Sequence, residues 1–230
     1  MAVTLRSFGQ SPGADSTSCV IVKPSGLAVG DLMIAQVVGA VAGTPGTFTA
    51  PGGWTEIRQD AWVGTGNDVK SALFKKIAVQ ADVDATNFTF TTPSCSSNRG
   101  TITAWYGHDA TTPINASNGQ GNAASTTITS PAVTPSVANC EVCLFCAIAD
   151  NSLVASYAIA TDNPASWAEV YDLPSNLTVD LGLSMAHALR PQTSATGLGT
   201  ATTTSDPNVG QLVMIAPATV TYEYGTATLS

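Results

Sequence analysis

The chain has 230 residues, of which 44% are hydrophobic and only 10% are charged, and its formal net charge is −8. So small a charged fraction excludes a disordered polyelectrolyte and a long charged coiled coil, and the length suffices for one domain with a large core. The eight basic residues are scattered, and only Lys75 and Lys76 are adjacent, so we expect no nucleic acid partner.

The first residues carry no targeting pattern. Residues 1–6 lack a basic region followed by an apolar one, so we expect no secretory signal peptide. No stretch reaches the roughly 20 apolar residues that span a bilayer, so we expect no membrane partner. Uncharged surfaces rich in Thr, Ser and Asn are typical of extracellular and virion β proteins. The protein is therefore expected either to stay in the cytosol or to leave it by a route other than its own leader. Synthesis in a host cytoplasm and assembly into a virion released by lysis is one such route.

The pattern of the chain predicts strands almost throughout. Short runs in which apolar and polar residues alternate are separated by Gly, Pro, Asn and Asp, as in an all-β protein. No window of a dozen residues has a capped helical stripe. In chain order, the predicted strands cover 3–8, 19–23, 31–38, 54–61, 69–77, 87–92, 101–106, 126–129, 140–148, 167–171, 177–189, 197–203 and 211–215.

A seven-residue pattern occurs twice in the chain. The segment PGGWTEI at 51–57 returns as PASWAEV at 164–170. The stretches before and after each copy also match, with Ile34 aligned to Leu144 and Leu73 aligned to Leu183. The repetition predicts a duplicated unit of about six strands.

The duplication predicts a single β-sandwich domain over residues 1–217, with repeat halves of about 18–107 and 125–217. Two small sandwiches in tandem are the alternative. The stretch 113–125, rich in Asn, Gly and Ala, is interpreted as the connector between the halves. We expect the matched residues of the two copies to form the structural core of the repeat: Trp54, Trp167, Glu56 and Glu169. A sugar-stacking platform is the alternative for the two tryptophans.

Three of the five cysteines, Cys140, Cys143 and Cys146, follow the spacing of a zinc or iron–sulfur site. The segment around them has the apolar length of a buried strand, in which residues three apart point to opposite faces. We therefore expect buried free thiols and no metal.

The sequence offers few catalytic groups. His187 falls in the apolar register of a strand and is interpreted as a core or groove histidine, and His108 with Asp109 as part of a turn. Glu56 and Glu169 could form a glycosidase pair, but their matched places favour a structural role. We expect no catalytic residue, no cofactor and no enzyme activity.

Two loops have oxygen-bearing residues that suit calcium. These are Gly64–Asp68 and Ser205–Asn208. Each also has the composition of an ordinary hairpin turn, and neither has the spacing of a defined calcium loop. We expect no metal-binding residue in either loop.

The last residues, 218–230, lie beyond the second repeat. Val220, Tyr222 and Tyr224 share one face of a predicted strand. Such a segment can pair with a sheet edge on a neighbouring copy or another protein. It can equally fold back as an edge strand of its own domain, and the sequence leaves both interpretations open.

Three motifs resemble a family of β-sandwich proteins of tailed bacteriophages and bacterial surfaces. They are KPSGLAVGDLMIA at 23–35, APGGWTEI at 50–57, and WYGHD at 105–109 followed by PINAS at 113–117. The resemblance runs from about Ser18 to Pro217. His108 stands where the family usually has Val, and Asn115 where it usually has Asp.

The resemblance implies a jelly-roll-like, two-sheet β-sandwich and a non-enzymatic role. It implies a virion structural protein, in particular a capsid decoration or cement protein that binds a phage capsid or tail protein and copies of itself as an oligomer. A receptor- or carbohydrate-binding sandwich of a tail fibre or adhesin, with a glycan as partner, is the alternative. The family pattern names no catalytic residues, so none are carried over.

Overall fold

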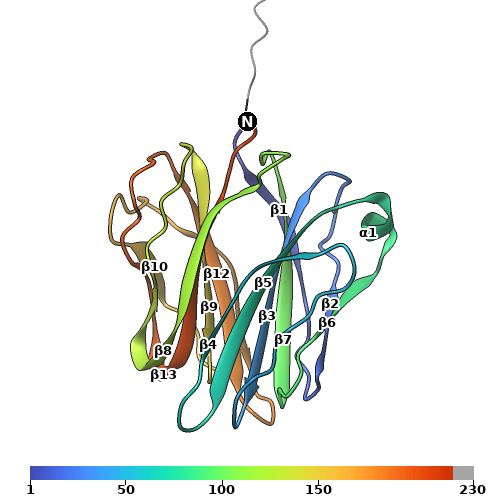
Figure 1. The fold of residues 1–230 in the computed structure, drawn as a ribbon, viewed down its shortest axis with the longest axis vertical. Helices are drawn as coiled ribbons and strands as arrows, with labels where there is room; N and C mark the ends of the chain where they lie inside the picture. Colours follow the sequence, from blue (N-terminus) through green and yellow to red (C-terminus); the bar gives the residue numbers. More distant parts are fainter. Residues whose placement is uncertain (220–230) are drawn as a thin grey trace, which may run out of the picture.

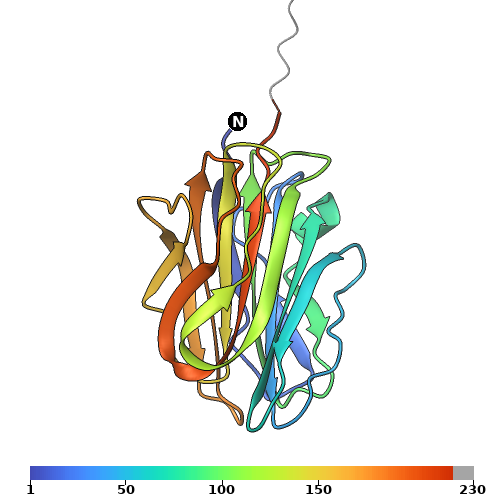
Figure 2. The ribbon, with the colours of Figure 1, turned by 60° about the vertical axis from the view of Figure 1, so that its left-hand side comes forward.

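The computed structural model describes residues 1–219. Within them the chain is built almost entirely of antiparallel strands, with one short helix, and forms two large sheets packed face to face (Figures 1 and 2). The prediction of an all-β sandwich is therefore confirmed. The elements are β1 (Thr4–Gln10), β2 (Ser18–Val22), β3 (Leu32–Val41), β4 (Thr55–Trp62), β5 (Asp68–Ile77), α1 (Gln80–Asp84), β6 (Asn87–Thr91), β7 (Ser97–Tyr106), β8 (Ile114–Ser130), β9 (Cys140–Ile148), β10 (Ser156–Ile159), β11 (Ala168–Ser175), β12 (Leu181–Arg190) and β13 (Gly199–Ile215).

The two large sheets enclose the central core. The first has the order β1-β7-β3-β5-β4, and the second has the order β10-β13-β9-β12-β11, with β8 also paired to β13. Alternate residues of the inner strands point into the space between the sheets, because successive side chains of a strand point to opposite faces. The largest of these buried side chains include Trp105, Phe145, Leu32, Ile34 and Leu73.

Each large sheet also has an apolar layer on its outer face. The small β2-β6 sheet covers the first sheet and buries Ile21 and Phe90 against it. On the second sheet, residues such as Ile128 of β8 and Ile159 of β10 provide the equivalent cover. The central strands β3 and β9 are therefore apolar on both faces, which explains their nearly continuous hydrophobic sequence.

The two sheets share a strand order and a local irregularity. The order β7-β3-β5-β4 in the first sheet corresponds to β13-β9-β12-β11 in the second. The β4–β5 register shifts between Glu56 and Arg58, and the β11–β12 register shifts between Glu169 and Tyr171. These bulges occupy the same place in the two copies of the repeated motif. A shared order and a shared bulge are what a duplicated unit predicts.

The strand pairing corrects both predicted matches between the two copies. Arg58 pairs with Leu73 directly after the first bulge, and Tyr171 pairs with Met185 directly after the second. Leu73 therefore corresponds to Met185, and the predicted match with Leu183 is wrong.

The other predicted match is off by one residue. Thr55 pairs with Lys75, which pairs with Ile34. At the corresponding place in the second sheet, Ala168 pairs with His187, which pairs with Cys143. Ile34 therefore corresponds to Cys143, and the predicted match with Leu144 is wrong. Ile34 and Cys143 both face the central core, whereas Leu144 faces the outer layer.

The predicted connector at 113–125 is also wrong, because most of it belongs to the 17-residue strand β8. Its glycines let β8 lie directly against β4. A Cβ on Gly121 would lie 2.0 Å from the Ala61 carbonyl oxygen, and one on Gly119 would lie 2.7 Å from Asp60 Oδ2. The small residues that suggest a linker therefore allow two backbones to approach closely.

Several other boundaries differ from the prediction. Among them, β7 begins at Ser97 where 101 was expected, and β11 ends at Ser175 where 171 was expected. The strands expected at 197–203 and 211–215 are one continuous strand, β13, which curves from the outer layer into the second sheet. The strand expected from 177 begins only at Leu181. The short strand β10 and the short helix α1 were not predicted, since neither has a strong periodic pattern of its own.

Candidate functional site

The two repeated tryptophans lie outside the central core. Trp54 is half-buried and meets the rings of Phe88 and Phe90 edge-on, at centroid distances of 5.6 and 5.3 Å. Trp167 is half-buried too and stacks on Tyr157 at 6.4 Å. Each indole thus packs against the outer layer of its own sheet, instead of filling the space between the sheets.

Glu56 and Glu169 are exposed, so the expectation of a core position does not hold for either. Each stands directly before the register shift of its strand. Glu56 accepts a 2.8 Å hydrogen bond from Gln59 Nε2, and Glu169 accepts one of 3.3 Å from the Tyr157 hydroxyl. The two carboxylates lie on different sheets.

The alternation predicted for the three clustered cysteines is confirmed. Cys143 faces the central core, whereas Cys140 and Cys146 face the outer layer of the second sheet. All five cysteines are buried free thiols. Burial raises the pKa of Cys140 to about 11 and that of Cys146 to about 12, which opposes the thiolate form that binds metals. One ion cannot contact side chains on both faces of this strand.

His187 lies at the edge of the central core, as its strand register predicts. Its Nδ1 is 2.5 Å from Glu141 Oε1, and its ring packs edge-on against Trp105 at 5.0 Å. The pair spans β9 and β12, and Trp105 comes from the opposite sheet. No serine, threonine or cysteine hydrogen-bonds to this ring among the described residues, so the geometry provides no nucleophile for it to activate.

Of the two segments considered for calcium, Gly64–Asp68 forms the turn between β4 and β5, as predicted. Ser205–Asn208 lies within the continuous strand β13, so the prediction of a hairpin turn there is wrong. Asp68 Oδ1 accepts a hydrogen bond from the Gly64 amide. Asp206 Oδ2 accepts one from the Thr204 hydroxyl. Residues 1–219 contain no group of three or more His, Cys, Asp or Glu side chains placed to hold a metal ion.

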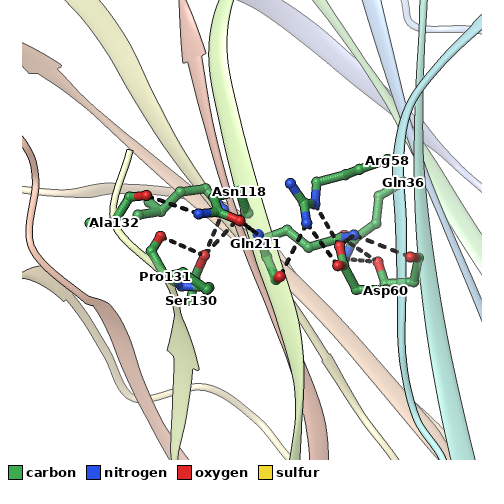
Figure 3. A network of polar contacts seen from close by, with 11 residues as sticks. Gln36, Arg58, Asp60, Asn118, Ser130, Pro131, Ala132 and Gln211 are labelled. Atoms are coloured by element: carbon green, nitrogen blue, oxygen red, sulfur yellow. Dashed lines mark hydrogen bonds and ion pairs between the residues drawn. The ribbon is translucent and has the colours of Figure 1, made fainter. Parts of the chain in front are cut away.

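A hydrogen-bonded network of buried polar side chains joins the two sheets through the middle of the core (Figure 3). Gln211 of β13 donates to Asp60 Oδ2 of β4 at 2.8 Å and accepts from the Ser71 hydroxyl of β5 at 2.8 Å. Gln36 of β3 donates to the Cys146 carbonyl at 2.9 Å and accepts from the Tyr171 hydroxyl at 2.8 Å.

The network continues to the edge of the sandwich. Arg58 donates to both oxygens of Asp60, at 2.5 and 2.7 Å, and to the Gly119 carbonyl of β8 at 3.1 Å. Satisfied buried networks of this kind fix one arrangement of their partners. The polar atoms of Gln36 and Gln211 therefore set how the two sheets face each other. A glutamine within an apolar run, LMIAQVVGAV at 32–41 and VGQLVMI at 209–215, is the sequence signal that could have identified both residues.

At the end of the sandwich near residue 1, Leu189 separates two shallow pockets. It is 49% exposed. One pocket, of about 390 Å³, is lined by residues 162–166, Pro191 and Gln192, and the other, of about 320 Å³, by residues 1–2, Asn139, Pro217 and Ala218. We call these residues together the Leu189 surface. Its one acidic side chain, Asp162, lies 3.5 Å from Arg190, and the Met1 amino group lies 3.5 Å from the Ala218 carbonyl oxygen, so the surface carries little charge.

Nearly every basic side chain forms an ion pair or a hydrogen bond with another group of the molecule. Ion pairs join Arg6 to Asp31, Arg58 to Asp60, Lys76 to Asp82 and Arg190 to Asp162. Lys23, Lys70 and Arg99 donate to backbone carbonyls. Within residues 1–219 only the Lys75 ammonium has neither kind of partner. The unpaired charge that remains at the surface is therefore mostly negative.

No family model, curated protein or solved structure matches the chain. The resemblance to phage and bacterial surface sandwiches therefore remains a prediction from the motifs. The described part of the chain has no helix that is long and apolar enough to cross a membrane. Val220, Tyr222 and Tyr224, the predicted partner contacts, lie outside the described residues.

Proposed function

We propose that this chain is a non-enzymatic structural protein of a bacteriophage virion, acting as a capsid decoration or cement protein. The observation that carries the proposal is that most basic side chains and two buried glutamines bond to partners within the molecule. Basic side chains pair within the molecule, and buried glutamines lock the two sheets together. Such side chains stabilise a fixed shape and are not free to bind or transform a small substrate.

A decoration protein needs a surface that a particle can cover. The Leu189 surface suits this purpose because it carries little charge on a molecule of net charge −8, so covering it buries few unpaired charges. Residue 219, after which the predicted partner-contact segment begins, immediately follows its Pro217 and Ala218. We assign the contact with the particle to this surface, and propose that copies of the chain occupy equivalent sites.

The decisive measurement is the number of copies in purified particles, by quantitative mass spectrometry and electron microscopy. Hundreds of copies on the shell support the decoration role, a few copies at the tail support a tail protein, and none overturns the virion assignment. When purified protein is added to particles that lack it, the Leu189→Asp variant should occupy fewer sites than the unmodified protein, because the substitution places a charge in the contact. Leu153→Asp is the matched control, since Leu153 is 58% exposed and lines neither pocket.

One observation favours carbohydrate binding as the second candidate. The stacked Tyr157 and Trp167 rings adjoin the 390 Å³ pocket, and Trp167 Nε1 donates to Asn163 of its lining. Aromatic faces beside amide side chains are typical of sugar sites. A glycan array would test it: binding lost in Trp167→Ala and kept in Trp54→Ala supports this candidate, and no binding by the unmodified protein rejects it.

A further inference from the structure

Lys75 of β5 is half-buried and lines a pocket of about 170 Å³. The pocket lies between the start of β3, the end of β5, the turn before β4 and the loop after β7, which contribute Leu32, Gly53 and Thr111 among others. None of the lining side chains is acidic. Because the Lys75 ammonium has no bonding partner within residues 1–219, a partly buried charge stands here without the counter-charge that such groups usually have.

The duplicated unit shows what this position has in its other copy. Lys75 of β5 corresponds to His187 of β12. Two residues before their partners on the neighbouring strands stand Leu32 in the first copy and Glu141 in the second. Glu141 places a carboxylate oxygen 2.5 Å from His187 Nδ1. The first copy therefore has the nitrogen-bearing side chain of this pair, but an apolar residue in the place of the carboxylate.

Acidic side chains around the pocket do not supply the missing group. Those that bond to the lining residues, or stand next to them in the chain, all have partners other than Lys75: Asp82 with Lys76, Asp31 with Arg6, Glu56 with Gln59, and Asp109 with two amides of its own loop. The Lys75 charge is therefore available to a group from outside residues 1–219.

We propose that this pocket is a binding site for one carboxylate group. Lys75 supplies the positive charge, and the threonine hydroxyls of Thr55 and Thr111 in the lining can donate hydrogen bonds to carboxylate oxygens. Leu32 and Ile77 offer apolar contact to the carbon atoms of the ligand. A carboxylate fits better than a phosphate, which carries up to about two negative charges, because Lys76 is already paired with Asp82.

Two sources can provide the carboxylate: a free organic acid, or Glu223, which is the one acidic residue of residues 220–230. The Thr219 hydroxyl donates to Asp109 Oδ2 at 3.2 Å, and the Thr111 amide donates to Asp109 Oδ1 at 2.9 Å. Four residues span up to roughly 14 Å, which brings Glu223 within reach of Thr111. The site is independent of the proposed virion function, because its tests use the isolated protein without particles.

The first experiment titrates acetate into the Glu223→Gln variant, which lacks the internal source. Acetate replaces chloride at constant ionic strength and pH, and NMR follows the backbone amides of Thr55 and Thr111. Both signals should shift and saturate. Adding Lys75→Met should abolish the shift, and adding Lys75→Arg, which keeps the charge, should retain it.

Lys23→Met in the same background is the matched control, because it removes a lysine that does not line the pocket and should leave the shift unchanged. The absence of a saturable shift in Glu223→Gln would overturn the site. An equal shift in folded Lys75→Met, or in Lys75→Gln should the methionine variant not fold, would overturn it too.

Comparing the unmodified protein with Glu223→Gln then identifies the source. If Glu223 fills the pocket, its substitution alone should move the Thr55 and Thr111 signals, and acetate should bind more tightly to the variant. If the ligand is a free acid, both proteins should bind acetate equally. Either result supports a carboxylate site, provided that the effect requires Lys75.

Discussion

Gln36 and Tyr171 join the two sheets through a 2.8 Å hydrogen bond between the Tyr171 hydroxyl and Gln36 Oε1, in the middle of the core. Both side chains are buried. A buried hydrogen bond adds little net stability, but removing one partner leaves the other unsatisfied in an apolar place. Their value therefore lies in fixing how the sheets face each other.

Gln36→Leu should lower the free energy of unfolding by about 1–3 kcal/mol, because the Tyr171 hydroxyl and the Cys146 carbonyl lose their partner. Urea unfolding of the variant and the unmodified protein measures the difference. Gln10→Leu is the matched control, since Gln10 is an exposed strand residue. Equal effects of the two substitutions would contradict a structural role for the network.

Gly121→Ala should destabilise the protein by about 1–3 kcal/mol, because the added methyl would overlap the Ala61 carbonyl and push β8 from β4. Gly52→Ala should have little effect, as nothing lies within 4 Å of a Cβ there. Thermal unfolding of both variants compares them. A neutral Gly121→Ala would show that β8 does not need this close approach.

Trp54→Ala should cost more stability than Trp167→Ala, although the two residues occupy matched places. Trp54 packs against two phenylalanines, whereas Trp167 stacks on one tyrosine. Because both indoles are half-buried, we expect less than the roughly 3–5 kcal/mol of a fully buried tryptophan. Denaturant midpoints of the two variants test the order, and the reverse order would refute this packing argument.

Titration of Asp172 should lower the free energy of unfolding as pH rises from about 4 to 6. Burial raises its pKa to about 6, so the folded state keeps the proton where an unfolded carboxyl, near 3.9, has lost it. The Val154 amide bonds one oxygen, and the other is buried without a partner among the described residues.

Asp172→Asn removes this titration. The free energy of unfolding of the variant minus that of the unmodified protein should therefore be larger at pH 7.5 than at pH 4.5. Unfolding midpoints at the two pH values give both differences. The same difference at both would show that Asp172 is solvated and titrates normally.

The sequence by itself determined the local structure, because period-two alternation and turn residues act over short distances. It predicted the all-β class, the boundaries of β9, and the opposite faces of Cys143 and Cys146. It also identified the repeated tryptophan motif, whose two copies contain the same bulge.

Tertiary structure alone decided which strands meet and which polar groups are satisfied. The glycines of β8 resemble a linker in sequence, and only the approach of Ala61 shows why side chains are excluded there. The predicted match of Ile34 with Leu144 was off by one residue, because two similar side chains need not lie on the same face of their strands. The groups around Gln36 and Lys75 are distant in sequence, so no local pattern could reveal that Gln36 links the sheets or that Lys75 lines a pocket.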